Sequence, residues 1–195
     1  MRPPNPHQNR RSRVSKSKRV ILGVTASIAA YKSGDIIRRL RERGWRVSVV
    51  MTKDAVRFIS PLTLASLSGE KVYRKMFALK EGAWDMSHIT LAEEADILLI
   101  APATANIIGK FACGLADDLL TCTVIATKAP VLIAPAMNTQ MYQNKIVQEN
   151  ISRLKKVGVG FIAPTKGRLA CGTTGDGHLA EAEDIVKAVE QARKK

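Results

Sequence analysis

The sequence predicts an α/β fold in which a parallel sheet is covered by helices on both faces. Strand-like and helix-like segments alternate along the chain, which is typical of parallel strands joined by helical crossovers. The runs Asp96–Ala101 and Pro130–Ala134 are almost entirely apolar, as expected for strands that are buried on both faces. The 195 residues are enough for one such domain with a substantial core.

The expected elements follow one another in a regular order. The first strand, Arg19–Val24, leads into a helix over Ile28–Arg43, which Gly44 terminates. Further strands are expected at Arg46–Met51, Asp96–Ala101, Pro130–Ala134 and Val159–Ala163. Further helices are expected after Ser60-Pro61, and over Thr104–Lys128 with a break near Gly114, Tyr142–Val157 and Ala182–Arg193. The glycine-rich segment Gly167–Gly177 is expected to be a loop.

The charge is unevenly distributed along the chain. The formal net charge is +14, and residues 1–19 hold seven Lys or Arg and no acid. Residues 1–18 are therefore expected to form a disordered basic tail, and residues 19–195 the folded domain. The tail's composition fits a solvated leader or an arm for nucleic acid or an anionic surface. The leader is the preferred interpretation, so a nucleic-acid partner is not expected.

Cysteine usage and hydropathy narrow the class of protein. The three cysteines are odd in number and are not spaced as C-x-x-C, which argues against a disulfide framework and a metal site. Cys113 and Cys122 lie in apolar helical contexts and are interpreted as packing residues. No apolar run reaches the ~18 residues of a membrane span. The sequence thus predicts a cytoplasmic protein with no metal and no membrane association.

Ligands of parallel sheets bind at the carboxyl ends of the strands, so the residues that follow each strand are the first candidates for a site. Residues 23–28 (GVTASI) offer small side chains, two hydroxyls and the start of a helix, which suits a phosphate and equally suits a plain turn. After the second strand, Thr52 and Lys53 suit a phosphate better than a ribose diol. This favours a mononucleotide over NAD, although Thr52 also suits a helix cap.

Five more side chains follow or precede the later strands. Thr104 and Asn106 suit a helix cap that directs backbone amides at a ligand. The amide of Asn138 suits a helix cap or the grip of a carboxylate. His88 precedes a helix that feeds a buried strand, and a surface role and an acid–base role both fit it. Cys171 lies in the glycine-dense segment and is the strongest candidate for a reactive side chain.

Six sequence blocks at the strand ends together resemble the homo-oligomeric flavin-containing cysteine decarboxylases. They are GVTASIAAYK (23–32), MTKDAVRFI (51–59), SHITLAEEAD (87–96), APATAN with GLADDLLT (101–106 and 114–121), PAMNTQMY (135–142) and LACGTTGDGHLAE (169–181). The resemblance covers about residues 18–193. Within the family it is strongest to the bacterial enzymes that act on phosphopantothenoylcysteine, which often form the N-terminal half of a bifunctional protein.

The resemblance implies a Rossmann-like or flavodoxin-like three-layer fold, FMN as the cofactor, and a role for each matching residue. The implied FMN contacts are Ala26, Ser27, Ile28, Thr52, Lys53, Asp54, Thr104, Ala105, Asn106 and Ala136. The implied catalytic residues are His88, Asn138, which would hold the substrate carboxylate, and Cys171, which would donate a proton. Asn138, Met141 and His178 are the implied substrate contacts.

The implied reaction is the FMN-dependent decarboxylation of 4′-phospho-N-pantothenoylcysteine to 4′-phosphopantetheine in coenzyme A biosynthesis. The thiol is oxidised to a thioaldehyde, CO2 leaves because its electrons delocalise into the C=S group, and the enethiol is reduced again. The implied partners are further copies of this chain, as a trimer or a dodecamer, and a phosphopantothenate–cysteine ligase.

Three positions depart from the commonest pattern of the family. Ile107 replaces a frequent threonine, Tyr142 a frequent tryptophan and His178 a usual arginine. One flavin hydrogen bond and the grip on the substrate phosphate are therefore in question. Four alternatives stay open: decarboxylation of a peptide's C-terminal cysteine, a regulatory subunit that inhibits a phosphatase, a flavin prenyltransferase, and a nucleic-acid binder that acts through the tail.

Overall fold

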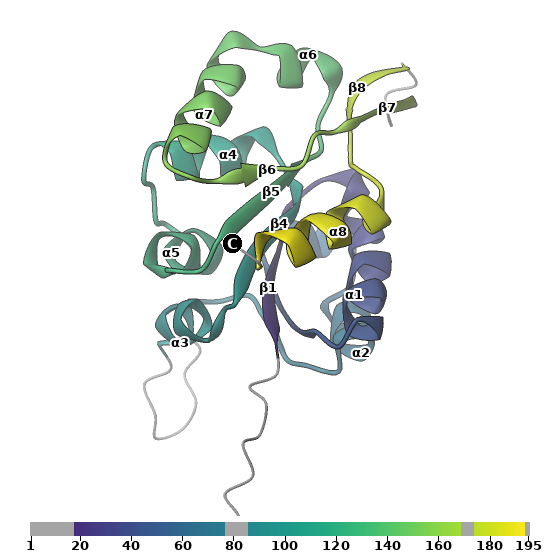
Figure 1. Ribbon diagram of the computed structural model, residues 1–195, viewed down its shortest axis with the longest axis vertical. Helices are drawn as coiled ribbons and strands as arrows, with labels where there is room; N and C mark the ends of the chain where they lie inside the picture. Colours follow the sequence, from purple (N-terminus) through teal and green to yellow (C-terminus); the bar gives the residue numbers. More distant parts are fainter. Residues whose placement is uncertain (1–17, 77–85, 169–173, 194–195) are drawn as a thin grey trace, which may run out of the picture.

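The computed structural model describes residues 18–76, 86–168 and 174–193, which form three layers (Figure 1). The middle layer is a six-stranded parallel sheet in the order β3-β2-β1-β4-β5-β6. Its strands are β1 (Arg19–Val24), β2 (Arg46–Met51), β3 (Val72–Tyr73), β4 (Ile97–Ala103), β5 (Val131–Pro135) and β6 (Gly160–Phe161). The predicted α/β fold is confirmed.

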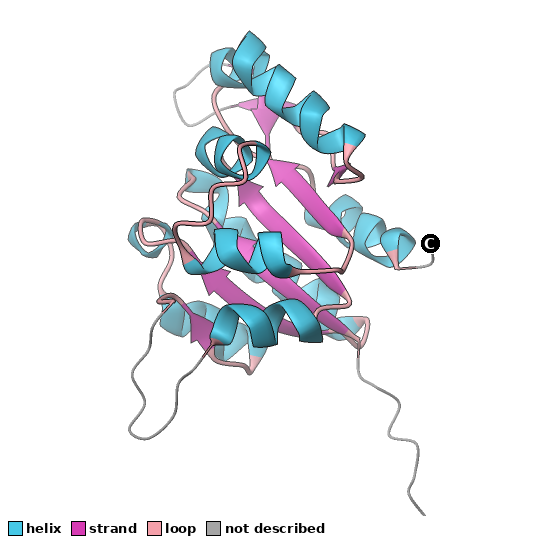
Figure 2. Cartoon of the chain, turned by 90° about the vertical axis from the view of Figure 1, so that its left-hand side faces the viewer, coloured by secondary structure: helices cyan, strands magenta, loops and turns pink. Residues whose placement is uncertain are grey.

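Helices cover both faces of this sheet, as Figure 2 shows. One face carries the 3-10 helix η1 (Ile28–Lys32), α1 (Ser33–Glu42), α2 (Pro61–Ser68) and α8 (Ala182–Ala192). The other face carries α3 (Ser87–Glu94), α4 (Ala105–Ala112), α5 (Leu119–Ala126) and α7 (Lys145–Lys156). The remaining elements are η2 (Ala55–Arg57), α6 (Thr139–Gln143) and an antiparallel hairpin of β7 (Thr165–Arg168) and β8 (Thr174–His178).

The residues of β1 show how one strand serves both cores. Val20 and Leu22 pack into the core on the α1 side, and Ile21 packs into the core on the α5 side, because successive side chains of a strand point to opposite faces. At Gly23 a Cβ atom would lie 2.6 Å from a methyl carbon of Leu120. Glycine at this position therefore lets α5 approach the strand end closely.

Several predicted elements are divided or shortened in the structure. The helix expected over Ile28–Arg43 is the 3-10 turn η1 followed by α1. The helix expected over Tyr142–Val157 is divided between α6 and α7 at Asn144, whose side-chain oxygen accepts a hydrogen bond from Ile146 N at 3.0 Å and so caps α7. The strand expected over Val159–Ala163 forms sheet pairs only at Gly160–Phe161.

The prediction of a loop over Gly167–Gly177 is wrong at both ends. Gly167 pairs with Gly175 across the β7–β8 hairpin. Glycine lacks the side chain that usually stabilises a strand, but here it makes room for a neighbour, because a Cβ at Gly167 would meet the His178 ring at 3.2 Å. The tight packing of Gly167 against the His178 ring explains why this segment is a strand, although its composition favours a loop.

Among the described residues, no helix is both long and apolar enough to cross a membrane. The predicted basic tail lies outside the described residues except for Lys18, whose ammonium group lies 5.7 Å from the centre of the Trp45 ring.

Candidate active site

Three strand ends meet at one edge of the sheet and are joined by two hydroxyl groups. Thr25, just after β1, is buried; its hydroxyl donates to Pro102 O at 2.7 Å and accepts from Thr104 N at 3.1 Å. The Ser27 hydroxyl donates to Ala136 O at 3.5 Å. The segments that follow β1, β4 and β5 are thereby fixed to one another. The sequence offers both hydroxyls of residues 23–28, but only Ser27 was expected to contact a ligand. The position of Thr25 directly after a strand was the available signal for its role.

The first two predicted cofactor stretches are neighbours at this edge. Ser27 is the N-cap of η1, and its side chain accepts from Ala29 N at 3.3 Å, so residues 23–28 do form a turn from a strand into a helix. Thr52 N donates to Val24 O at 3.1 Å, which places the end of β2 beside the end of β1. Ala26 is half-buried and Ile28 is exposed.

The second stretch presents charged side chains to solvent. Lys53 and Asp54 are exposed, and Asp54 lies 3.6 Å from Arg57 in an ion pair. Because Asp54 is neutralised by Arg57, the positive charge of Lys53 remains and favours binding of an anion. The observation supports the phosphate interpretation of residues 52–54 over a ribose site, because a ribose diol is usually bound by a free acid.

The third stretch is anchored by a helix cap. The Thr104 hydroxyl accepts from Ile107 N at 3.5 Å at the start of α4. Ala105 is half-buried, Asn106 is exposed, and Ala136 is buried beside them with its N–H donating to Ala103 O at 2.9 Å. The predicted departure at Ile107 faces the core, where this side chain is 2% exposed.

The predicted cofactor residues therefore surround one edge, and their chemistry fits a phosphorylated ligand. The group offers the hydroxyls of Ser27, Thr52 and Thr104, the amide of Asn106 and the ammonium of Lys53. Hydroxyl, amide and ammonium groups donate hydrogen bonds to phosphate and to ring carbonyls. Within the described part of the chain, no group of three or more His, Cys, Asp or Glu side chains is arranged to hold a metal.

Asn138 lies one strand further along the same edge. It is the N-cap of α6, and its Oδ1 accepts from Gln140 N at 2.8 Å. The helix-cap interpretation is therefore correct for the oxygen of this amide. The Nδ2 end is the donor end, which is the end that a carboxylate needs. Met141 follows in α6 and is 49% exposed. A side chain that contacts a ligand is expected to be exposed in this way when the ligand is not bound.

The β7–β8 hairpin lies against the turn that carries Asn138. Met137 N donates to Gly177 O at 3.0 Å. His178 follows, half-buried, with its Nδ1 3.3 Å from the Thr165 hydroxyl. The structure thus brings two of the three predicted substrate contacts, Asn138 and His178, to adjoining segments. Cys171, the predicted proton donor, lies outside the described residues.

His88 lies elsewhere in the chain. It is the second residue of α3, and its Nδ1 is buried without a hydrogen-bond partner among the described residues. In Figure 1, α6 lies at the top of the described part of the chain and α3 at its lower left. The described part of one chain therefore does not bring the imidazole to Asn138, and the predicted catalytic role of His88 stays a prediction.

The two described cysteines differ from each other. Burial, with the nearby charges of Asp118 and Asp117, raises the pKa of the Cys122 thiol, so this sulfur is a poor nucleophile and the packing interpretation fits it. Cys113 is exposed after α4, so the packing interpretation is wrong for this residue.

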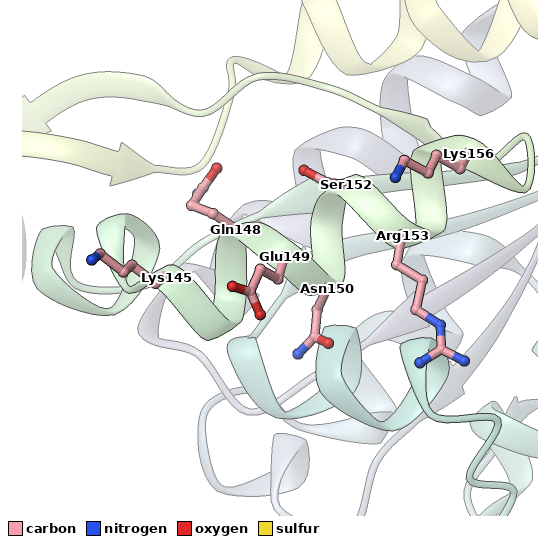
Figure 3. A pocket seen from close by; sticks show the side chains of 7 residues that line it. All are labelled: Lys145, Gln148, Glu149, Asn150, Ser152, Arg153 and Lys156. Atoms are coloured by element: carbon pink, nitrogen blue, oxygen red, sulfur yellow. The ribbon is translucent and has the colours of Figure 1, made fainter.

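A hollow of about 620 Å³ lies along α7 (Figure 3), and none of the strand-end residues described above is among those that line it. It is lined by Lys145, Gln148, Glu149, Asn150, Ser152, Arg153 and Lys156. Figure 3 shows these side chains pointing to different sides of the helix. Side chains that do not converge provide no binding geometry, so the strand ends are the better candidate for the site.

Known proteins match this chain over most of its length. A coenzyme A biosynthesis bifunctional protein, CoaBC, of Vibrio vulnificus is 47% identical over 174 residues, which are 89% of this chain and 43% of the relative. A "Probable phosphopantothenoylcysteine decarboxylase" of Streptococcus mutans is 42% identical over 177 residues, which are 90% of this chain and 98% of that protein. The chain spans less than half the length of the bifunctional relatives.

Solved structures share the fold. A cysteine-to-serine mutant of a PPC decarboxylase, in complex with pantothenoylaminoethenethiol, has a TM-score of 0.82 and 34% identity over 92% of this chain and 100% of its own. The FMN-binding protein AtHal3 has a TM-score of 0.75 and 36% identity over 90% of this chain and 96% of its own.

The family described as Flavoprotein matches residues 8–194, which include every strand end discussed above. The family membership predicted from the motifs is confirmed. The chain belongs to the flavoprotein family.

Proposed function

We propose that this chain is an FMN-dependent decarboxylase of phosphopantothenoylcysteine. The observation that carries the proposal is the joining of the strand ends after β1, β4 and β5 by the Thr25 and Ser27 hydroxyls, with the Asn138 turn beside them. This edge combines donors for a phosphorylated cofactor with an amide for a carboxylate. The likeness to the Streptococcus mutans protein over nearly its whole length supports the substrate.

The residues that would hold FMN are those of the three stretches at the edge. Ser27, Thr52 and Lys53 suit its phosphate, and Thr104 and Asn106 suit the polar edge of its ring. When bound, FMN supplies the two-electron chemistry that turns the substrate thiol into an electron sink and then restores it.

The chain's own residues orient the substrate and move protons. Asn138 would donate from Nδ2 to the substrate carboxylate and hold the bond to CO2 in the orientation from which it breaks. Cys171 would return a proton to the carbon that loses CO2. His178 would contact the substrate phosphate in place of a more usual arginine, without the bidentate geometry of a guanidinium.

His88 would complete the site of a neighbouring copy of the chain. Its position on α3, remote from α6 within one chain, supports this assignment, and so does its buried Nδ1 without a described partner. Self-association as a trimer or a dodecamer would bring it there. Ile28, Tyr31 and Leu62 are 58%, 61% and 74% exposed, and large exposed apolar side chains of this kind are commonly buried when copies associate.

Three further parts of the proposal concern context. The folded domain would extend from residue 19 to residue 195, preceded by the basic tail. The CoaBC relative supports a phosphopantothenate–cysteine ligase as a partner, on the same chain or a separate one. A cytoplasmic setting suits cysteines that are not arranged for a disulfide framework.

The test is turnover by the purified full chain. We expect the protein to carry a yellow chromophore that is released as FMN on denaturation, and to release CO2 from phosphopantothenoylcysteine. A peptide that ends in cysteine should react far more slowly. Asn138→Asp should keep the bound flavin and lose turnover, because it keeps the oxygen that caps α6 and removes the Nδ2 donor to the carboxylate. A colourless protein, or CO2 release from the peptide alone, would refute the proposal.

A further inference from the structure

Strand β8 approaches the turn that carries Asn138 at very short range. Besides the hydrogen bond from Met137 N to Gly177 O at 3.0 Å, two glycines of β8 have no room for a side chain. A Cβ at Gly175 would come closer than 3.0 Å to the Thr139 hydroxyl, and a Cβ at Gly177 would do the same to Met137 O. Real Cβ atoms essentially never make contacts that short.

Gly177 also has a backbone that favours glycine. Its φ is +118°, a region that other residues rarely adopt. Thr165 pairs with His178 and Lys166 pairs with Asp176, so Gly177 is the extra residue of a β-bulge. A bulge bends a strand, and this bend lies immediately before His178. Gly177 is thus both the extra residue of the bulge and the residue that lies close to the turn.

Thr139 provides the opposing surface. Its hydroxyl is buried and has no hydrogen-bond partner among the described residues. A buried hydroxyl without a partner costs free energy, so its place is explained by shape: it fills the space against Gly175. Because Thr139 follows Asn138 directly, this contact constrains the position of the Asn138 amide.

We propose that Gly175, Gly177 and Thr139 are positioning residues that fix the separation between the Asn138 amide and His178. We name these three residues the hairpin seam. The inference rests on the proposed function, in which Asn138 holds the carboxylate at one end of the substrate and His178 contacts the phosphate at the other. A rigid seam lets both ends bind at once, because it presets the span that the substrate must bridge.

The seam makes a steric prediction that distinguishes its two glycines. A methyl group at position 175 meets a side chain, and Thr139→Ala would remove that hydroxyl and leave only the Thr139 Cβ, at 3.3 Å. A methyl group at position 177 meets backbone, which no side-chain substitution can relieve. Thr139→Ala should therefore rescue Gly175→Ala and should not rescue Gly177→Ala.

The first experiment is a double-mutant cycle with two substrates, phosphopantothenoylcysteine and pantothenoylcysteine, which lacks the phosphate. A misplacement of about 1 Å can cost on the order of 100-fold in rate, so Gly175→Ala should lower kcat/KM for the phosphorylated substrate by roughly 10- to 100-fold, mainly through KM. The substrate without phosphate does not have to reach both Asn138 and His178, so its kcat/KM should fall much less. Adding Thr139→Ala should restore the preference for the phosphorylated substrate.

The matched control is Gly44→Ala. Gly44 has a φ of +77° and nothing within 4 Å of a Cβ, so this variant carries backbone strain without a steric clash. It should lower the melting temperature and leave the preference between the two substrates unchanged. If Gly175→Ala lowers kcat/KM equally for both substrates, or if Thr139→Ala fails to restore the preference for the phosphorylated substrate, the seam does not position the substrate and the proposal is overturned.

The second experiment does not depend on the reaction. Hydrogen exchange at the Met137 amide, read by mass spectrometry of the full chain, should be faster in Gly175→Ala and return to the wild-type rate in the double variant. Unchanged exchange in Gly175→Ala would overturn the seam. A wild-type protein that acts on neither substrate would instead refute the proposed function, and the exchange result would still decide whether the seam exists.

Discussion

Thr25 offers the sharpest test of how the site is held together. The residue is 2% exposed, and its hydroxyl satisfies two backbone groups at the end of β4, the carbonyl of Pro102 and the N–H of Thr104. Thr25→Val keeps the shape of the side chain and leaves both groups without that partner. Thr25→Ser keeps the hydroxyl and removes only a methyl group. The pair of variants therefore separates hydrogen bonding from packing.

The expected magnitude follows from the burial of each group. An unsatisfied buried backbone group costs about 1–3 kcal/mol. The hydrogen bond to Thr104 N is only part-buried, so water can compensate in part there, and the total for Thr25→Val should be about 2–4 kcal/mol. Loss of one buried methyl group in Thr25→Ser costs about 1 kcal/mol. At about 2–4 °C per kcal/mol for a domain of this size, Thr25→Val should lower the melting temperature by on the order of 10 °C.

Urea unfolding of both variants, with and without added FMN, provides the measurement. Thr25→Val should also weaken FMN binding, because Thr104 and the segment around it are released from β1. Equal stability of the valine and serine variants would show that the Thr25 hydroxyl does not join the ends of β1 and β4.

Three further predictions concern assembly, pH and packing. His88→Asn and Asn138→Leu should each abolish turnover, and mixed oligomers should regain part of it if one site uses two chains; no recovery after confirmed mixing would assign both residues to one chain. The Glu183 carboxylate accepts hydrogen bonds from Arg43, which directly follows α1, and from Arg39 of α1. The Arg43 guanidinium above all holds the pKa of Glu183 below its ordinary value, so the stabilising contribution of this carboxylate is present above the ordinary pKa and is lost as the pH falls through the lowered pKa. The loss of melting temperature in Glu183→Gln, measured against the control Asp184→Asn, should therefore be present at pH 7 and disappear in acid, and a loss that persists in acid would contradict the ion pairs. Ile107→Thr should destabilise the chain by about 1–3 kcal/mol in urea and should not tighten FMN binding, because the side chain faces the core; tighter binding would contradict this.

The fold could be predicted where burial alone determines the pattern. β4 is buried at every residue from Ile97 to Ala103, and such two-sided burial leaves the run of apolar residues that the sequence shows. The start of α2 was equally legible, because Ser60 accepts from Leu62 N and Pro61 occupies the first helical position. β3 was missed, since Val72–Tyr73 is two residues long and only half-buried.

The sequence could predict where the site lies, but not which of its residues contact one another. The rule that ligands bind at strand ends selected residues 23–28 and Thr104, the family resemblance added Ala136, and the structure brings these residues to one edge. The hydrogen bond from Thr25 to Pro102 joins residues 77 positions apart, and no local pattern encodes such a pair. The location of His88 relative to Asn138 is also a matter of tertiary and quaternary structure.

The β7–β8 hairpin shows why glycine is difficult to interpret from sequence. A dense run of glycines indicates conformational freedom when nothing packs against it, and close approach when something does. The two cases have the same composition and differ only in a distant partner, which here is the turn at 137–139. Flexibility would make substitutions of Gly175 and Gly177 similar in effect and independent of Thr139. Close approach makes the effect of substituting Gly175 depend on Thr139, whereas the effect of substituting Gly177 does not. The response to Thr139→Ala therefore decides between the two interpretations.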